Sequence, residues 1–418
     1  MQRIHGSNHI KFFGLEDELR LSTNLSFSYL LEFAPFVLNE TNYLVLTYGA
    51  PLEAPLESTA ETFLSKTISY WRTWVKRTSI GNFYQSQVIR SALVLKIHQY
   101  EDTGALIAAS TTSLPESPGA GRNWDYRYCW LRDTFYTLNA FNNIGHFEEL
   151  DKYFHYIANI CLKSKDRLQP LYSISGQSDL VEKTLDLKGY MGNNQPVRVG
   201  NQAYEHIQND VYGQVLVSLL PLYADKRFIL SERTESREMI LQILDHIDKT
   251  MDEKDAGLWE FRELSQYHCY TFLFHWAGTC AAINIARELN DEEMAHKAEE
   301  LLKRAAARLE DCYDSERGVY TQAVGTKNLD ASTLQLILMN YLDPASEKAR
   351  KHLENLEAEL KSENGLFYRY KHQDDFGVPE TTFLICAFWY VETLAAVGRV
   401  DDAIEKFESL LQYSNHLG

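Results

Sequence analysis

Two kinds of helical segment alternate along most of this chain, and their alternation limits the folds open to it. One kind is apolar nearly all the way round, so it must be buried on every side. The other kind carries one apolar stripe opposite a charged face, so it can cover a core while facing water. The first kind occupies residues 211–223, 270–286, 334–342 and 383–397, and the second occupies residues 237–249, 291–310, 347–360 and 401–411.

Inner and outer helices that take turns in this way predict two concentric rings, an all-α (α/α) toroid, rather than a bundle of equivalent helices. We expect about eleven toroid helices from near Tyr84 onward. An even number is expected, which leaves one helix to be sought beyond Gly418. No short repeat with a fixed consensus occurs, which disfavours a helical solenoid.

The chain ahead of the toroid divides into a strand segment and one long helix. Residues 1–55 contain short two-periodic runs around Leu19, around Phe27 and from Tyr43, which predict strands. Strands with one apolar face need partners, so this segment is too small to be a β domain alone. Residues 56–80 predict an amphipathic linker helix, and residues 81–418 predict the toroid.

The charge and the cysteines of the 418-residue chain exclude several classes of partner. A formal net charge of −17 argues against a nucleic-acid surface, because such a surface needs Lys and Arg to neutralise phosphates. The six cysteines are scattered without a CxxC pair, which is typical of reduced, buried thiols and predicts a cytoplasmic protein. There is neither a signal peptide nor an apolar run of about eighteen residues, so we expect no membrane partner.

The densest polar motif is GRNWDYRYCWLRD, from Gly121 to Asp133, directly before an apolar helical run. Flat aromatic faces beside arginine and aspartate suit a sugar, whose C–H faces stack and whose hydroxyls form hydrogen bonds. Arg132 and Asp133 could clamp adjacent hydroxyls, or form only a weak ion pair within the helix. A packed helix cap is the structural alternative, but so many polar groups are rarely gathered without a use. The motif therefore predicts a carbohydrate site.

Each of the other polar motifs also falls just before, or at the start of, an apolar helix. HIQND precedes the fourth toroid helix, GLWEFRE the sixth, NLDAS the eighth and GVPETTF the tenth, as WLRD precedes the second. If the inner helices run parallel, these starts share one mouth, where helix dipoles and unpaired N–H groups suit carboxylates and sugar oxygens. We therefore expect the site at one end of the ring.

Two glutamates in these motifs could act as the acid and the base of a glycosidase. Glu260 follows Trp259, and a carboxyl held against tryptophan tends to stay protonated and can donate a proton. Glu380 precedes the longest apolar run, where helix N–H groups would keep a carboxylate ionised as a base. Either alone is more simply a helix cap or a surface residue. At matching helix starts the pair favours glycoside hydrolysis.

One long polar segment could also contribute to the site, and motifs for metal, cofactor and other hydrolase chemistry are absent from the sequence. The segment from Lys163 to Gln208 is too long for a simple connector, and we expect it to form a wall of the binding site. The wall residues are Tyr190, Arg198, Asn201 and Tyr204. His268 and His275 lie on an apolar helix, where packing is a simpler explanation than zinc binding. There is no HExxH motif, no GxSxG elbow and no phosphate loop, so we expect no metal and no cofactor.

At these residues the chain closely resembles glycoside hydrolase family 15, the glucoamylase-like enzymes, in their bacterial and archaeal branch. The motifs RNWDYRYCWLRD, PVRVGNQAYEHIQND, GLWEFRE, NLDAS and PETTFLICAFWYVE follow in the family's order over about residues 80 to 418. The resemblance implies an (α/α)6 barrel of the six-hairpin glycosidase type behind an N-terminal β-sandwich. The opening strands would be the tail of that sandwich.

By this resemblance Glu260 is the general acid and Glu380 the general base of a single-displacement hydrolysis with inversion, which releases β-glucose and needs no cofactor. Inversion requires room for a water between the carboxyls, about 6.5–9.5 Å. Trp130, Arg132 and Asp133 would line the subsite for the terminal glucose. The further residues expected at the sugar are Trp124, Asp125, Tyr126, Asn201, Tyr204, Gln208, Asp210, Trp259, Arg262 and Trp389.

Three departures from the family's pattern stand out. Glu263 and Thr381 stand where many relatives have glycine, and both could reshape the rim of the pocket. The sandwich is incomplete, and the chain stops at NHLG where relatives usually continue into a twelfth, inner helix. Without that helix the ring would expose apolar inner surface.

The leading hypothesis is an exo-acting α-glucosidase of glucoamylase type, which cleaves α-glucans or oligosaccharides from their non-reducing ends. An α,α-trehalase of the same family is its nearest rival, because the loops that would select the second sugar carry no readable code. A disaccharide phosphorylase uses a similar barrel with an acid alone, and Glu380 argues against it. A non-catalytic glycan-binding toroid is the third alternative.

Overall fold

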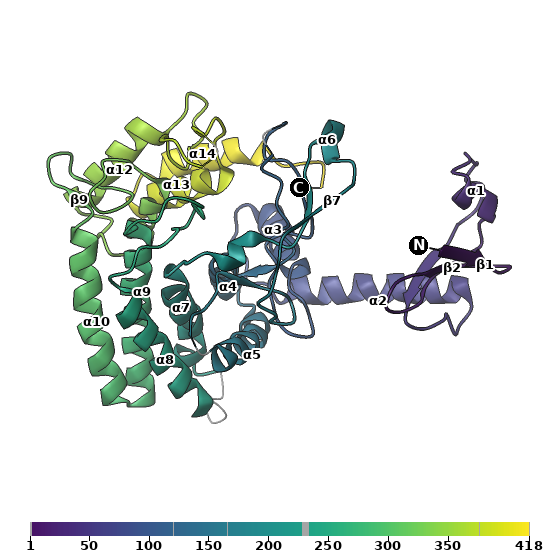
Figure 1. The fold of residues 1–418 in the computed structure, drawn as a ribbon, viewed down its shortest axis with the longest axis horizontal. Coiled ribbons are helices and arrows are strands. Elements are labelled where there is room, and N and C mark those ends of the chain that lie inside the picture. Colours follow the sequence, from purple (N-terminus) through teal and green to yellow (C-terminus); the bar gives the residue numbers. More distant parts are fainter. Residues whose placement is uncertain (1, 120, 165, 228–233, 376, 418) are drawn as a thin grey trace. The chain divides into compact units, whose positions relative to one another are not determined.

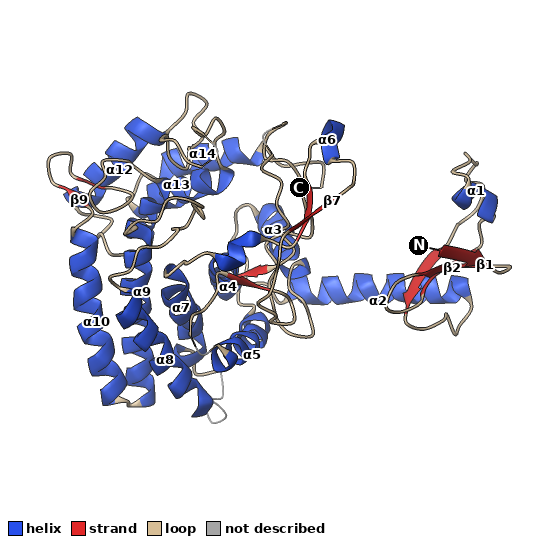
Figure 2. Cartoon of the chain, viewed as in Figure 1, coloured by secondary structure: helices blue, strands red, loops and turns tan. Residues whose placement is uncertain are grey.

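The computed structural model describes residues 2–119, 121–164, 166–227, 234–375 and 377–417 (Figures 1 and 2). The chain forms two compact units, Met1–Thr78 and Ser79–Gly418. The first unit holds the larger sheet, and helices dominate the second (Figure 2). Among the described residues, no helix is long and apolar enough to span a membrane.

The first unit is built on a four-stranded antiparallel sheet. Its strands, hydrogen-bonded in this order, are β1 (Gln2–His5), β2 (His9–Phe13), β3 (Leu19–Thr23) and β4 (Leu44–Tyr48). The two-periodic runs around Leu19 and from Tyr43 therefore form strands, as predicted. Strand β1, at the opening of the chain, was not expected.

The run around Phe27 is not a strand, which corrects the prediction from its alternation. It forms a short helix, α1 (Phe27–Leu31), in which the Glu32 N–H bonds to the Ser28 carbonyl at 3.1 Å. Phe33 ends the turn with a left-handed φ of +53°. Alternation over three residues fits one turn of helix as well as it fits a strand, so the pattern could not decide.

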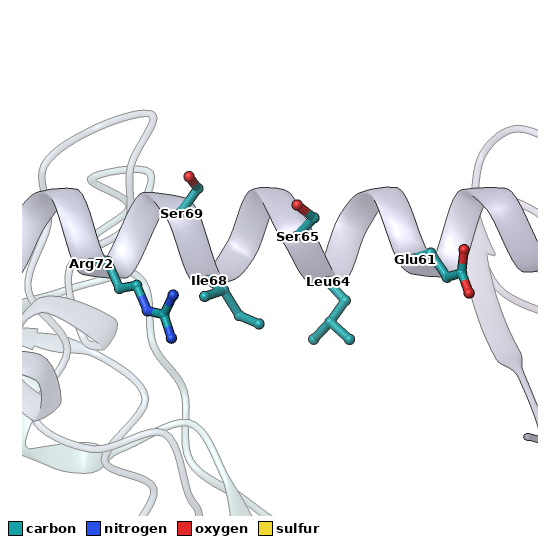
Figure 3. Close-up of a pocket in the computed structure, with 6 residues that line it drawn as sticks. All are labelled: Glu61, Leu64, Ser65, Ile68, Ser69 and Arg72. Atoms are coloured by element: carbon teal, nitrogen blue, oxygen red, sulfur yellow. The ribbon is translucent and has the colours of Figure 1, made fainter.

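The linker helix, α2 (Leu56–Lys76), starts directly after Pro55, close to its predicted bounds. One stretch of it lines a shallow hollow, and Figure 3 shows Leu64 and Ile68 projecting from the same side of the helix. The hollow is lined by Glu61, Leu64, Ser65, Ile68, Ser69 and Arg72. All six come from this one helix.

The second unit contains the toroid helices in the predicted order. They are α3 (Gln85–Ile97), α4 (Leu131–Asn143), α5 (Phe147–Lys163), α7 (Asp210–Ala224), α8 (Thr234–Thr250), α9 (Cys269–Leu289), α10 (Glu292–Glu310), α11 (Gln335–Leu338), α12 (Glu347–Leu360), α13 (Leu384–Ala396) and α14 (Val400–Leu411). Short elements lie between them, namely β5 (Cys129–Trp130), β6 (Leu171–Tyr172), β7 (Lys183–Leu185), α6 (Tyr190–Asn193), β8 (Val197–Val199), β9 (Tyr313–Asp314) and β10 (Val319–Tyr320).

The apolar helices form the inner ring. Helix α4 packs against α7, α7 against α9, α9 against α11 and α11 against α13. Tyr136 of α4 and Trp389 of α13 lie with their ring centroids 5.6 Å apart, so side chains of the first and last of these helices also meet. Helices α8 and α10 cover α7 and α9 from outside, and Figure 1 shows the four side by side. The fold is the predicted (α/α) toroid.

Helices α7 and α9 approach each other closely because glycines face each other at their crossing. A Cβ placed on Gly213 would lie 1.8 Å from the Phe274 carbonyl oxygen, and one placed on Gly278 would lie 2.5 Å from the Gly213 Cα. No side chain fits between these backbones. The close crossing holds together two of the inner helices whose preceding loops form the site.

Three predicted inner or outer helices differ in detail. Helix α11 ends at Leu338, short of the expected Leu342, because Asn340 turns into the left-handed region with φ +57°. Helix α12 begins after Ser346, which caps it by accepting the Ala349 N–H at 3.1 Å, and Pro344 lies just ahead of the cap.

Helix α13 is not buried on every side, which corrects the expectation from its apolar sequence. Leu384, Ile385 and Phe388 are 41%, 36% and 39% exposed. Within the described part of the chain, α13 packs mainly against α11 and α14. The apolar sequence shows that every face of this helix could be buried. It does not show which neighbouring elements are present to cover those faces, so the prediction of complete burial was wrong.

Candidate active site

Glu260 is held by two side chains of the aromatic motif. The Trp130 indole N–H donates to Oε1 of Glu260 at 2.7 Å, and the Arg132 guanidinium donates to the same oxygen at 3.2 Å. Arg132 also donates to the Leu258 carbonyl at 2.9 Å, which ties it to the same loop. Among the described residues nothing hydrogen-bonds to Oε2, and the side chain is 24% exposed. One carboxyl oxygen is therefore anchored and the other is available.

The backbone of Glu260 is strained. Its φ is +60°, in the left-handed region that residues other than glycine rarely occupy. Such a conformation costs on the order of 1–3 kcal/mol and persists only where the surroundings enforce it. The Glu260 N–H bonds to the Gly257 carbonyl at 3.2 Å, and the Phe261 N–H bonds to the Ala256 carbonyl at 3.1 Å. The resulting turn aims the carboxyl of Glu260 toward Trp130.

Arg132 places a positive charge next to Glu260. Burial alone would lower its pKa, but the carboxylates of Asp133, Glu260 and Asp210 raise it, so the guanidinium stays charged. The ion pair between Arg132 and Asp133 is present at 3.1 Å, and the Asp133 side chain is 40% exposed. The two side chains therefore present a charged donor and a charged acceptor side by side.

Asp210, the first residue of α7, is fully buried. Gln214 donates to its Oδ2 at 2.8 Å, while its Oδ1 accepts no hydrogen bond from the residues that the structure describes. Burial raises the pKa of Asp210 to about 7, the charge of Asp255 adds to the rise, and Arg132 opposes it. Gln208 is also buried, and in the described part of the chain neither of its side-chain polar atoms has a hydrogen-bond partner. Contact of Asp210 and Gln208 with a sugar stays a prediction, favoured by polar atoms that need a water or a ligand.

Trp259 lies at the centre of an aromatic cluster, and its indole N–H donates to Asp330 at 2.8 Å. The neighbouring ring centroids are those of Tyr370 at 6.4 Å, Phe383 at 6.1 Å and Trp389 at 6.2 Å. The indole that hydrogen-bonds Glu260 belongs to Trp130, so the tryptophan that precedes Glu260 in sequence is not the one that holds its carboxyl.

Glu380 lies on an exposed loop ahead of α13. The helix begins at Leu384 with Phe383 as its N-cap residue, so Glu380 does not sit among the helix N–H groups as the sequence suggested. Within the described residues no hydrogen bond or ion pair engages its carboxylate. The Glu380 side chain is therefore exposed to solvent on this loop.

The loops of Glu260 and Glu380 contact each other. Asp375 accepts the backbone N–H of Arg262 at 2.6 Å and that of Glu263 at 3.2 Å. Elsewhere at this end of the ring, Asp255 accepts the Asn209 N–H at 2.9 Å, which joins the start of α7 to the loop before α9. These bonds bring the polar motifs together at one end of the inner helices, as predicted.

The remaining predicted residues fall into two groups. Two guanidinium groups, those of Arg198 and Arg262, lie 4.8 and 4.6 Å from the ring centroid of Trp124. The ring centroids of Tyr126 and Trp130 lie 6.0 Å apart. Tyr126 and Tyr204 both pack against the buried apolar cluster that contains Trp130. This first group supplies aromatic surface.

The second group is buried and already bonded. Asp125 accepts the guanidinium of Arg127 at 2.8 Å and the Gly200 N–H at 3.2 Å. Asn201 accepts the Ala203 N–H at 3.0 Å and donates to the Asp125 carbonyl at 3.1 Å. Their placement favours a supporting role within the segment that was expected to form the wall, over direct contact with a ligand.

Three side chains at the site were not expected from the sequence: Asp330, Arg369 and Asp375. Asp330 lies in NLDAS, whose position ahead of an apolar helix was the available signal. The Arg369 guanidinium lies 5.7 Å from the ring centroids of both Trp259 and Phe383. Arg369 and Asp375 stand on a loop without periodic pattern, so nothing in the sequence marked them.

The two histidines considered for zinc are packing residues. Burial lowers the pKa of His268 and of His275 to about 4, which keeps both rings neutral near pH 7. The Nε2 atom of His275 lies 2.9 Å from the Asn209 carbonyl oxygen. Within the described ranges, no group of three or more His, Cys, Asp or Glu side chains could hold a metal ion.

An (α/α) toroid with two glutamates and an aromatic cluster at one end of its inner helices has the architecture of the six-hairpin glycosidases. The chain belongs to glycoside hydrolase family 15, since the profile described as Glycosyl hydrolases family 15 matches residues 82–415. This agrees with the resemblance carried by the motifs.

Curated relatives share a name. A protein named trehalase from Thermoplasma volcanium is 34% identical over 85% of this chain and 56% of its own length. The trehalase of Thermoplasma acidophilum is 32% identical over 90% of this chain and 64% of its own length, and that of Mycobacterium tuberculosis is 35% identical over 84% and 52%. The chain thus spans between half and two thirds of the length of these relatives.

Solved structures share the fold. A bacterial glucoamylase complexed with acarbose aligns with a TM-score of 0.68 at 17% identity, over 98% of this chain and 68% of that chain. A wild-type glycosidase aligns with a TM-score of 0.60 at 15% identity, over 81% and 87%. At these identities the likeness is one of fold alone.

Proposed function

We propose that this chain carries the catalytic toroid of an inverting α-glucosidase, and that α,α-trehalose is its substrate. The observation that carries the proposal is the anchoring of Glu260 through one oxygen, beside a loop whose Glu380 has no described partner. The name shared by the curated relatives supports the disaccharide over the α-glucans that the sequence placed first. The glucoamylase structure supports the fold only.

In the proposed reaction Glu260 is the general acid. Because Trp130 and Arg132 occupy its Oε1, the proton is carried on Oε2 and passes to the glycosidic oxygen as the bond to the anomeric carbon breaks. Glu380 takes a proton from a water that attacks this carbon from the opposite face. One β-glucose and one α-glucose result, and proton exchange with solvent restores both carboxyls.

The surrounding side chains bind the sugar. Arg132 and Asp133 suit adjacent hydroxyls, because a charged donor and a charged acceptor lie side by side. The half-buried rings of Tyr126 and Trp259 supply faces for C–H groups. Residues 81–418 form the catalytic domain in this proposal, residues 56–80 link it to the strand segment 1–55, and the six free cysteines support a cytoplasmic location.

The direct test is NMR of the first products from trehalose, maltose, isomaltose and starch. We expect trehalose to be cleaved fastest and to release α- and β-glucose in equal amounts at first, because inversion changes only the attacked sugar. Release of α-glucose alone contradicts inversion. Faster cleavage of starch favours the glucoamylase type, phosphate-dependent release of a sugar phosphate favours a phosphorylase, and binding without turnover favours a glycan-binding toroid.

Two variants test the roles of the carboxyls. Glu260→Gln and Glu380→Gln should each lower kcat by about 10²–10⁴-fold with unchanged circular dichroism. Glu363→Gln, on an exposed loop of the same unit, is the control and should keep its rate. Near-normal turnover of either site variant removes the role assigned to that residue.

A further inference from the structure

We propose that Asp375 is a positioning residue for the general acid: its carboxylate holds the strained turn that aims Glu260. The inference rests on the proposed function, because it assigns Asp375 a part in that reaction. Asp375 itself does not touch the reacting atoms in this scheme. It acts through the backbone of the Glu260 loop.

The hydrogen bonds of four successive N–H groups carry the argument. Those of Glu260 and Phe261 are bonded within the turn, to the carbonyls of residues 257 and 256. Those of Arg262 and Glu263 both bond to the Asp375 carboxylate, at 2.6 and 3.2 Å. Asp375 is 112 residues away from Glu263 in sequence. The second half of the turn is therefore tied to a distant loop through one side chain.

The backbone of Glu260 needs such a tie. A left-handed φ of +60° in a residue with a Cβ is disfavoured, and it persists only when neighbouring bonds enforce it. Once the Arg262 and Glu263 N–H groups are released, the turn can relax toward negative φ. The Glu260 carboxyl then swings away from the indole of Trp130, which fixes its orientation.

The loop that carries Asp375 is itself anchored by the preceding residue. Asp374 accepts two hydrogen bonds from the Arg122 guanidinium, both at 3.1 Å, and one from the Tyr370 hydroxyl at 2.8 Å. Arg122 belongs to the aromatic motif that also contains Trp130. Two adjacent aspartates thus connect the loop of Glu380 to both segments that define the position of Glu260.

The experiment compares substrates that differ in their need for an acid. Trehalose has a poor leaving group that must be protonated, whereas α-glucosyl fluoride loses fluoride without a proton. For Asp375→Ala we expect kcat on trehalose to fall about 10–100-fold with KM within about threefold, because a misaimed acid fails only in the transition state. On α-glucosyl fluoride the same variant should keep kcat within about threefold.

Two further variants serve as controls. Asp375→Asn keeps one acceptor oxygen and should recover part of the trehalose rate. Asp314 also accepts two backbone N–H groups, from Glu316 at 3.1 Å and Arg317 at 3.2 Å, in a turn outside the site. Asp314→Ala should therefore leave both rates unchanged, although it removes bonds of the same kind.

Equal losses on both substrates overturn the inference, because they indicate damage to Glu380 or to the fold in place of a misaimed acid. An unchanged trehalose rate in Asp375→Ala overturns it too. Failure of the proposed function is recognised separately, since the wild-type protein would then not cleave trehalose. The comparison in that case uses whichever α-glucoside with a sugar leaving group the wild type cleaves, with the same two outcomes.

Discussion

Trp130 determines which oxygen of Glu260 is occupied. The indole N–H and the Arg132 guanidinium both bond to Oε1, so the carboxyl has one fixed and one available oxygen. A salt bridge alone would allow either oxygen to face the arginine. The directional indole bond removes that freedom, which is why a neutral donor matters beside a charged one.

Trp130→Phe should therefore lower kcat/KM on trehalose by about 10–100-fold, because a hydrogen bond to the negative charge that develops on Glu260 as its proton leaves contributes about 1.5–3 kcal/mol. The phenyl ring keeps most of the packing. Steady-state kinetics check the prediction. Trp276→Phe is the control, since Trp276 packs edge-on against Tyr341 and should keep the rate. Equal effects of the two changes would show that packing, and not the bond to Glu260, is responsible.

Asp210 gives a pH dependence of stability with a definite sign. Its pKa is raised to about 7 in the folded chain and is about 3.9 in an unfolded one. At pH values between these two pKa values the folded state binds the proton more tightly than the unfolded state. The contribution of this carboxyl to the free energy of unfolding therefore falls as pH rises from about 4 to 7. Relative to Asp210→Asn, the wild type should lose free energy of unfolding over that window.

Urea unfolding of both proteins at several pH values measures this difference. His268, His275 and His352 act with the opposite sign, because burial lowers the pKa of each to about 4 and their contribution rises between about pH 4 and 6.5. Both proteins contain these histidines, so the difference isolates Asp210. A difference that does not change with pH contradicts the raised pKa.

The crossing of helices α7 and α9 leaves no room for a side chain at Gly213. Gly213→Ala places a methyl group 1.8 Å from the Phe274 carbonyl oxygen, so the helices must move apart. We expect a loss of about 1–3 kcal/mol or more in the free energy of unfolding. Thermal denaturation measures it. Gly81→Ala, where a Cβ meets nothing within 4 Å, is the control and should change stability little.

The succession of helices could be predicted because their apolar positions repeat with the helical period. Ser346 and Pro344 show the limit of this reasoning, because either could begin α12 and only the bond to Ala349 decides. The exposed face of α13 escaped prediction because burial depends on neighbours. Local pattern therefore identified the elements, and packing determined their ends and faces.

The site was only partly predictable for a related reason. The motifs marked Glu260, Arg132 and Trp130 as chemistry-bearing residues, but no spacing states that the Trp130 indole reaches a carboxyl 130 residues further along. Asp375 shows the same limit more strongly, since it is an exposed loop residue whose partners are backbone N–H groups. Nearly every residue has a backbone N–H group, so a sequence does not indicate which of these groups a side chain will bond.

The six cysteines of the chain should behave as free, poorly reactive thiols. All are free; five are buried, and Cys280 is half-buried. Burial raises the pKa of Cys280 to about 11, so even this thiol should react slowly at neutral pH. We expect mass spectrometry after alkylation of the native protein to find at most one label, and six after denaturation. Labelling of several thiols in the native state would indicate a looser core.

The left-handed backbone of Glu260 means that the side chain proposed for catalysis lowers the stability of the fold at this position. Glycine relieves the strain, so the free energy of unfolding of Glu260→Gly should exceed that of Glu260→Ala by about 1–2 kcal/mol, although neither variant should be active. Selection for turnover alone keeps a Cβ there. A lineage released from that selection is expected to drift toward glycine, and glycine at this position would then mark a pseudoenzyme.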